Sequence, residues 1–392
     1  MSKLNELISE LCPLGVPRVP ISELGTLTRG KRFVHADAVE DGIPCIHYGE
    51  LYTYYGVSTK STKSFVRSDL ADKLRYAKKN DVIIVGAGEN DTDIGIAVAY
   101  LGEEKVAVHD ACYIFSHDND PKYISYCLRT EDYHNQIKKY VSSGKICAIS
   151  ADGIGRAVIP IPPLEVQREI VRVLDGFIEL NDVLAEELKL RNQQYQGCSR
   201  QLFESIHNSA QRYELWQLCD VVKGMSPIQK TNPGEYPLVV TTSERKSSES
   251  YQFDTEAVCI PLVSSRGHGV ASLNHVYYQE GKFALGNILC AVIPLDSSVL
   301  SAKYLYYYFE ESKDYSLVPL MKGGANVSLR IEDILKIKIP VPSFEAQMKI
   351  VHSLDTFDEM CNSQLTGLPA EIKARQQQYS HYRDQLLTFT TI

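Results

Sequence analysis

The chain has 392 residues, of which 44% are hydrophobic and 23% charged, and its formal net charge at pH 7 is −8. This composition is typical of a globular protein of two or three domains, and no apolar run approaches the roughly 20 residues of a membrane-spanning helix. The negative charge argues only mildly against a nucleic-acid partner. The ten cysteines include no CxxC pair, which argues against structural zinc and disulfides, so we expect reduced thiols and a cytoplasmic location.

The first predicted element is an amphipathic helix in MSKLNELISELCP, where Glu6 and Glu10 interrupt any apolar core of a signal peptide. Short β-rich runs bounded by Gly, Asn and Asp turns follow. They cover residues 81–88 and 94–101 and, in the second half of the chain, residues 257–265 and 286–293.

A nineteen-residue stretch occurs in two similar copies: IPIPPLEVQREIVRVLDGF at 159–177 and IPVPSFEAQMKIVHSLDTF at 339–357. Each copy predicts the start of a helix, because prolines precede it and an acidic residue falls in its first turn. Fainter matches come before each copy. They pair residues 21–30 with 215–224, 123–128 with 304–309, and 142–154 with 322–334.

Each predicted helix carries a long apolar seam. In the first copy the seam has alternating spacings of four and three, a heptad pattern, through Ile170, Leu174, Phe177, Asn181, Leu184, Leu188, Arg191, Tyr195, Cys198 and Leu202. We expect the two helices to pack antiparallel, with Leu174, Phe177, Leu184 and Leu188 facing Leu354, Phe357, Leu368 and Ile372. Four extra residues around 365–371, with Gly367 and Pro369, predict a kink or break in the second helix.

These patterns predict an α+β protein with a pseudo-two-fold internal repeat, in which two similar globular heads are separated by two long antiparallel coiled-coil helices. The predicted regions are head 1 with the N-terminal helix at 1–158, helical spacer 1 at 159–212, head 2 at 213–338 and helical spacer 2 at 339–392. Such an arrangement suits a two-fold target such as duplex DNA.

From LCPLGVPRVPISELG (11–25) through both IP-x-P helix openings, the sequence resembles the specificity subunit of type I restriction-modification systems. The resemblance implies that each head is a target recognition domain for one half of a bipartite double-stranded DNA target. It also implies that the helices set the spacer and dock two methyltransferase subunits, with restriction subunits joining for cleavage. No catalytic residue, cofactor or membrane contact is implied.

Side chains that suit base or phosphate contact gather in a few loops of each head. In head 1 the candidates are Arg29, Lys31, Arg32, Lys60, Lys63, Ser143 and Lys145. In head 2 they are Lys223, Thr242, Ser243, Arg245, Lys246, Arg266, Lys322 and Asn326, with His268 beside Arg266. The loops at 142–145 and 322–326 stand at equivalent places in the repeat, which favours them over the others.

Two alternatives to DNA recognition remain open. His109 and Asp110 could be a catalytic pair, but no nucleophile or third member accompanies them, and no phosphate-cradling or methyl-donor motif is present. The chain could also be a non-catalytic coiled-coil scaffold that bridges two proteins without reading DNA. We expect a non-catalytic subunit with no metal.

Overall fold

The computed structural model describes residues 3–242, 244–266, 269–363 and 366–389. The chain divides into two compact units, Met1–Val183 with Ile372–Ile392, and Leu184–Glu371. Each unit contains one head and parts of the long helices. Within the described residues, no helix is both long enough and apolar enough to cross a bilayer.

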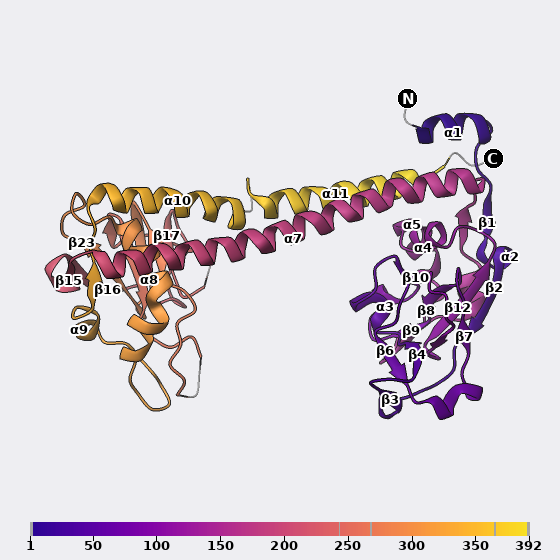
Figure 1. Cartoon of the computed structure of the whole chain (residues 1–392), viewed down its shortest axis with the longest axis horizontal. Helices are drawn as coiled ribbons and strands as arrows, with labels where there is room; N and C mark the ends of the chain where they lie inside the picture. Colours follow the sequence, from indigo (N-terminus) through magenta and orange to yellow (C-terminus); the bar gives the residue numbers. More distant parts are fainter. Residues whose placement is uncertain (1–2, 243, 267–268, 364–365, 390–392) are drawn as a thin grey trace. The chain divides into compact units, whose positions relative to one another are not determined.

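The first unit is an α+β head with the beginning of the long helix α7 (Figure 1). Its helical elements are α1 (Lys3–Leu11), α2 (Ile21–Leu24), η1 (His35–Asp37), α3 (Glu50–Thr53), η2 (Ser68–Lys73), η3 (Asp91–Asp93), α4 (Pro121–Cys127), α5 (Glu131–Lys138), α6 (Ala151–Gly155) and the first part of α7 (Leu164–Ser209). Its strands are β1 (Arg18–Pro20), β2 (Gly25–Arg29), β3 (Ala38–Val39), β4 (Ile43–Ile46), β5 (Ser58–Thr59), β6 (Ser64–Val66), β7 (Tyr76–Ala77), β8 (Val82–Val85), β9 (Ala87–Gly88), β10 (Ala97–Tyr100), β11 (Val106–Val108), β12 (Cys112–His117), β13 (Cys147–Ala148) and β14 (Val158–Pro160).

The second unit contains head 2, the end of α7 and the helix that follows the head. Its strands are β15 (Arg212–Glu214), β16 (Cys219–Lys223), β17 (Tyr236–Val239), β18 (Lys246–Ser248), β19 (Phe253–Asp254), β20 (Ala257–Pro261), β21 (Tyr277–Gln279), β22 (Lys282–Leu285), β23 (Leu289–Pro294) and β24 (Lys338–Pro340). Its helical elements are η4 (Leu215–Gln217), α8 (Ala302–Ser316), η5 (Val318–Leu320), α9 (Ile331–Ile334) and α10 (Phe344–Asn362). The last helix of the chain is α11 (Leu368–Leu386).

The two heads have corresponding sheets. The order β2-β12-β8-β10-β5 in head 1 corresponds to β16-β23-β20-β21 in head 2, and β3-β6-β4-β11-β7 corresponds to β18-β17-β22-β19. Each second sheet contains one parallel pair, β4 with β11 and β17 with β22. The duplication that the faint sequence matches predicted is therefore confirmed at the level of strand order.

The repeated stretch fastens each head to the long helix that follows it. Tyr123 donates its hydroxyl hydrogen bond to the carbonyl of Pro160 at 2.8 Å, and Tyr304 does the same to Pro340 at 2.9 Å. These bonds form where each head meets the helix opening.

The repeated glutamines and aspartates complete the same joint. The side-chain oxygen of Gln167 accepts from the backbone N–H of Asp120 at 3.0 Å, and that of Gln347 from Ser301 at 2.9 Å. About two turns further on, an aspartate in each helix accepts a tyrosine hydroxyl and a lysine ammonium from the head. The triads are Tyr126, Lys122 and Asp175 in the first copy and Tyr307, Lys303 and Asp355 in the second. The nineteen residues repeat because the same joint is built twice.

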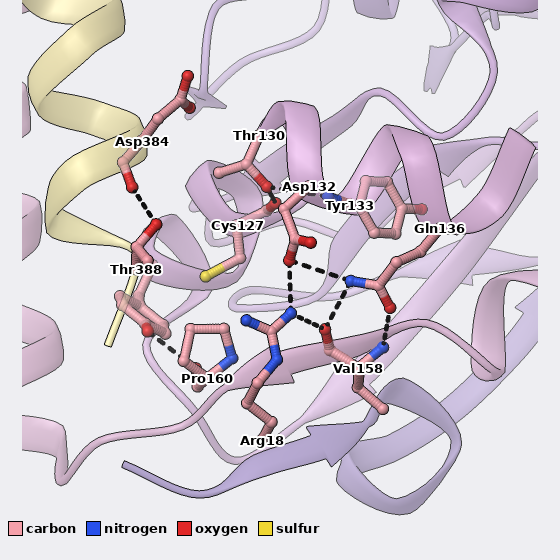
Figure 2. A network of polar contacts seen from close by, with 11 residues as sticks. Arg18, Cys127, Thr130, Asp132, Tyr133, Gln136, Val158, Pro160, Asp384 and Thr388 are labelled. Carbon is pink, nitrogen blue, oxygen red and sulfur yellow. Dashed lines mark hydrogen bonds and ion pairs between the residues drawn. The ribbon is translucent and has the colours of Figure 1, made fainter. Parts of the chain in front are cut away.

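A further network holds the helix opening of the first copy to head 1 (Figure 2). Arg18 of β1 forms an ion pair with Asp132 of α5 and donates to the carbonyl of Val158 at 3.0 Å. Gln136 donates to the same carbonyl at 3.0 Å and accepts from the Val158 N–H at 2.8 Å. The short β1–β14 pair is thus anchored to α5 just before α7 begins.

The long helices pack antiparallel within each unit, but in a different register from the one expected. In the first unit Phe177 of α7 stacks on Tyr382 of α11 at 5.4 Å. In the second unit Tyr195 of α7 contacts Phe357 of α10 at 6.2 Å. Leu174 and Leu354 belong instead to the two head cores. The prediction that Leu174 and Phe177 face Leu354 and Phe357 was therefore wrong, because the two leucines serve the joints between helix and head.

The predicted break in the second helix is confirmed between α10 and α11. A Cβ on Gly367 would lie 2.4 Å from the carbonyl oxygen of Glu359 and 2.6 Å from that of Met360. Only glycine fits against the end of α10 at such a distance. Pro369 then stands in the first turn of α11, where its missing N–H costs nothing.

Buried tyrosines and thiols fill much of the two cores. Tyr304, Tyr307 and Tyr308 of α8 are almost fully buried. None of the ten cysteines, all of which lie in the described part of the chain, forms a disulfide.

Candidate functional site

In head 1 the backbone just after β2 passes very close to the backbone at the end of β11. We call this close contact the crossing. Gly30 follows β2, and a Cβ there would lie 2.2 Å from the carbonyl oxygen of His109 and 2.3 Å from that of Val108. The Gly30 N–H donates to Cys112 at 2.9 Å, and the His109 N–H donates to Ile46 at 3.2 Å. Position 30 therefore requires glycine.

Head 2 contains the same crossing. A Cβ on Gly224 would lie 2.2 Å from the carbonyl oxygen of Gly286 and 2.6 Å from that of Leu285. The Gly224 N–H donates to Leu289 at 2.9 Å, and the Gly286 N–H donates to Val239 at 3.0 Å. These bonds make Gly30 equivalent to Gly224, His109 to Gly286, and Ile46 to Val239.

A short hairpin next to the crossing also occurs in both heads. Residues 142–148 are closed by a bridge between Ser142 and Ala148, and residues 322–328 by a bridge between Lys322 and Ser328. The equivalence that the sequence predicted for these loops is confirmed.

One residue in each head joins the hairpin to the crossing. In head 1 the Gly86 N–H donates to Ala111, and the Gly86 carbonyl accepts from Ile149, both at 2.8 Å. In head 2 the Leu262 N–H donates to the carbonyl of Ile288, and the Leu262 carbonyl accepts from the Leu329 N–H, both at 2.8 Å. Loops that are far apart in the sequence thus converge at one edge of each head, which we call the rim.

The candidates near the crossing are cations on either side of its glycine. Arg29 ends β2 and donates its Nε–H to the carbonyl of Asp110 at 2.7 Å, and the exposed Lys31 and Arg32 follow Gly30. In head 2 the exposed Lys223 ends β16 at the equivalent of Arg29. All four therefore lie at the rims.

The hairpin candidates are also exposed at the rims. Ser143 and Lys145 are exposed in the head 1 hairpin, as are Lys322 and Asn326 in that of head 2. Arg266 lies on a loop beside the second hairpin, where the Ser264 N–H donates to Val327 at 3.0 Å.

The loops beside the two hairpins carry opposite charge. In head 1 the loop after β9 contains Glu89, Asp91 and Asp93, whereas the corresponding loop of head 2 contains Arg266. The same backbone frame therefore presents a mixed rim in head 1 and a basic rim in head 2.

The remaining candidates lie elsewhere or are engaged in the fold. Lys60 and Lys63 are exposed on the β5–β6 connector, and the Lys63 ammonium lies 4.8 Å from the centre of the Tyr54 ring. Thr242 and Lys246 are exposed around β18. Ser243 and His268 lie outside the described residues.

Arg245 is the candidate whose side chain is most clearly engaged within the head. Its guanidinium donates to Gln279 at 3.1 Å and to the carbonyl of Tyr278 at 3.2 Å, and it lies 5.1 Å from the centre of the Tyr277 ring. This arginine fastens its loop to β21.

The sequence did not single out a cluster of rings at the rim of head 1. The His109 and His47 ring centres are 4.4 Å apart, His47 and Tyr48 are 4.7 Å apart, and Phe33 lies 5.0 Å from His109. Tyr52 extends the cluster from Tyr48 at 6.5 Å. The only available signal was the dense run HYGELYTYY directly after an apolar strand.

The His109 ring is held by its own loop, and its Nδ1 also lies 3.3 Å from the Asp110 carboxylate. Its Nε2 lies 3.1 Å from the carbonyl of Phe33, and its Nδ1 accepts from the Ala111 N–H at 3.1 Å. Burial lowers the pKa of His109, and neighbouring His47 lowers it further. Both nitrogens of a neutral imidazole are thus occupied in holding the loop.

The cleft beside the Figure 2 network has the wrong charge for a phosphate site. It measures about 250 Å³ and is lined by Glu131, Asp132 and Asp384 among others. No candidate cation lines it. Across the residues that the structure describes, no group of three or more His, Cys, Asp or Glu side chains could hold a metal ion.

Comparison with known families accounts for the duplicated heads. The family model described as "Type I restriction modification DNA specificity domain" matches residues 14–190 and again residues 209–374. The chain belongs to this family. The two matches correspond to the two copies of head and helix.

Curated relatives agree with this family. A type I restriction enzyme specificity subunit of Escherichia coli is 30% identical over 257 residues, which cover 59% of this chain and 63% of that protein. A putative type I restriction enzyme specificity subunit of Haemophilus influenzae is 30% identical over 259 residues, covering 59% of this chain and 64% of the relative. The matched region thus spans less than two thirds of either relative.

Solved structures show that the fold extends over nearly the whole chain. The HsdS subunit of Thermoanaerobacter tengcongensis superposes with a TM-score of 0.54 at 17% identity, covering 96% of each chain. The S subunit from M. genitalium gives 0.51 at 16% identity, covering 95% of this chain and 96% of that one. At these identities the likeness concerns the fold.

Proposed function

We propose that this chain is the DNA-reading subunit of a type I restriction-modification complex. Head 1, at 1–158, reads one half of a bipartite duplex target, and head 2, at 213–338, reads the other. The helical regions at 159–212 and 339–392 set the distance between the halves and dock two methyltransferase subunits. Restriction subunits join the same complex for cleavage, and this chain contributes no reacting group of its own.

One observation carries this proposal: the two heads share a backbone frame and differ in the side chains of its rim. The crossing glycines and the hairpins are equivalent bond by bond. The side chains around them differ in charge and type, as expected of two modules that read different sequences in the same way. Arg29, Lys31, Arg32 and Lys145 in head 1, and Lys223, Arg266, Lys322 and Asn326 in head 2, are the residues we assign to DNA.

The test is to graft residues 213–338 from a divergent relative into this chain and map methylated bases in cells that hold the matching methyltransferase. We expect one half of the modified bipartite motif to change while the other half and the spacer length persist. A change in both halves would contradict independent heads. Assembly with the methyltransferase but no sequence-dependent modification would favour the scaffold alternative.

The spacer role has its own test. Inserting four residues between Glu187 and Arg191 lengthens α7 by about 6 Å at 1.5 Å per residue. Duplex DNA rises about 3.4 Å per base pair. We expect the spacer of the modified motif to grow by one or two base pairs with both halves unchanged. An unaltered spacer in a variant that still methylates would show that the helices do not measure DNA.

A further inference from the structure

The His47 ring is packed in a fixed orientation, while its two imidazole nitrogens have no hydrogen-bond partner in the described part of the chain. Its ring packs on His109, with 4.4 Å between centres and 42° between planes, and on Tyr48. The His109 ring is itself fixed by its bonds to Phe33 and Ala111. Among the residues that the structure describes, the His47 imidazole makes no hydrogen bond, although its backbone N–H donates to Glu50 at 3.0 Å.

The surroundings of His47 lower the pKa of its imidazole below the usual histidine value. Burial lowers its pKa, the Glu50 carboxylate opposes this effect, His35 of η1 lowers the pKa, and Asp110 of the β11–β12 connector raises it. The charge of Arg32 lowers the pKa of the adjoining His109. A hydrogen-bond acceptor brought to the imidazole would favour the charged form.

In the described part of head 2, no histidine stands at the places equivalent to His47 and His109. Since Ile46 is equivalent to Val239, the residue equivalent to His47 is Val240, which is 2% exposed. His109 is replaced by Gly286 in the same backbone bond. The imidazoles are therefore additions to a frame that folds without them.

We propose that His47 is a DNA-contacting residue of head 1 that takes up a proton from solvent when it donates to an acceptor on the duplex, either a phosphate oxygen or the N7 or O6 of guanine. DNA binding by head 1 then strengthens as the pH falls, whereas binding by head 2 does not. This inference rests on the proposed function, and it names a contact and a pH dependence that the shared frame alone does not provide.

Linkage sets the size of the effect. One proton taken up on binding changes the affinity by up to about tenfold per pH unit, between the pKa of free His47 and its higher value in the complex. Because binding raises that pKa, affinity is highest below the free value and declines as the pH rises through the bound value. Above both values the pH dependence disappears.

The experiment uses the full chain assembled with its methyltransferase subunits, and a duplex that carries the motif modified in the host. Its Kd is measured at pH 6, 7 and 8 at constant ionic strength, for the wild type, His47→Gln and His275→Gln. His275 is the matched control, because it is an exposed histidine of head 2 that pairs with Glu310 at 3.2 Å. We expect His47→Gln to abolish the decline in affinity with pH and His275→Gln to keep it.

A second variant guards against a simple folding defect. His47→Lys carries a permanent charge, and we expect it to bind at pH 8 more tightly than His47→Gln with little pH dependence. If His47→Gln binds with the wild-type pH dependence, the inference is overturned while the proposed function survives. If neither the wild type nor any variant binds the motif more tightly than a scrambled duplex, the proposed function itself fails.

The two kinds of acceptor are separated by the modified motif in cells. A guanine contact predicts that His47→Gln relaxes one base position in the half read by head 1. A phosphate contact predicts uniformly weaker modification with the motif unchanged. Relaxation confined to the half read by head 2 would overturn the assignment.

Discussion

The two heads differ least where their backbones bond to themselves and to the long helices, and most at the rim. Gly30 and Gly224 occupy the same crossing, and Asp175 and Asp355 accept a tyrosine and a lysine in the same way. At the rim, His47 faces His109 in head 1 where head 2 has Val240 and Gly286. A few backbone and side-chain hydrogen bonds therefore set the shared fold of the two heads, while the side chains at the rim differ.

The largest expected effect tests whether the two joints are energetically equivalent. Leu174 and Leu354 are both 0% exposed and stand at matched places in the repeat. Replacing either by Ala should cost roughly 2–5 kcal/mol of unfolding free energy, measured by urea denaturation. Leu180→Ala is the control, since Leu180 is 38% exposed and should change stability by about 0.5 kcal/mol at most. A large difference between the two core variants would break the equivalence.

The second-largest expected effect concerns the aspartates of the two joints, Asp175 and Asp355. A double-mutant cycle of Tyr126→Phe with Asp175→Asn should give a coupling of about 1 kcal/mol, because a partly exposed charged hydrogen bond is worth about that much. The cycle of Tyr307→Phe with Asp355→Asn should give a similar value. Thermal or urea unfolding measures both. No coupling in either cycle would mean that the repeated aspartates do not hold the heads.

A smaller effect distinguishes the two copies, because Glu169 is replaced by Lys349 at the matched place. Hydrogen bonds from Arg172 and Lys3 lower the Glu169 pKa from 4.5 to about 2. The stabilisation by this carboxylate is therefore present above pH 4.5 and lost as the pH falls toward 2. We expect Glu169→Gln to be slightly less stable than wild type at pH 7, with the gap closing in acid.

Lys349 provides the control for that measurement. It pairs with Glu345 at 2.8 Å, and both side chains are at least 75% exposed. Lys349→Ala should leave the unfolding midpoint unchanged at both pH values. A gap between Glu169→Gln and wild type that widens in acid would contradict the assigned cause.

The smallest effect concerns the opposite charges beside the hairpins. Neutralising the loop of head 1 with Glu89→Gln and Asp91→Asn should tighten DNA binding a few-fold at low salt, because it removes repulsion from phosphates. The gain should shrink as salt increases. Arg266→Ala in head 2 should act in the opposite sense. Titrations at two salt concentrations measure both changes in DNA affinity. Changes of the same sign and size in both heads would contradict the proposed charge difference between the two loops.

Local chemistry determined a large part of this protein. The IP-x-P openings, the acidic first turns and the heptad spacing placed the long helices. Gly367 and Pro369 predicted the break between α10 and α11, because neither continues a helix easily. The faint repeats predicted equivalent heads and equivalent hairpins. Each of these signals acts over a few residues, so it can be read along the chain.

The tertiary structure decided which side chains share a surface and which helix faces meet. Phe177 packs on Tyr382 rather than in the expected set, because Leu174 is used by the head core. Arg245 resembled the other loop cations in sequence, yet β21 holds its guanidinium. His47 and His109 lie 62 residues apart in the sequence, and only the parallel pairing of β4 with β11 brings their rings together. Contacts between distant strands depend on register and burial, which no local pattern specifies.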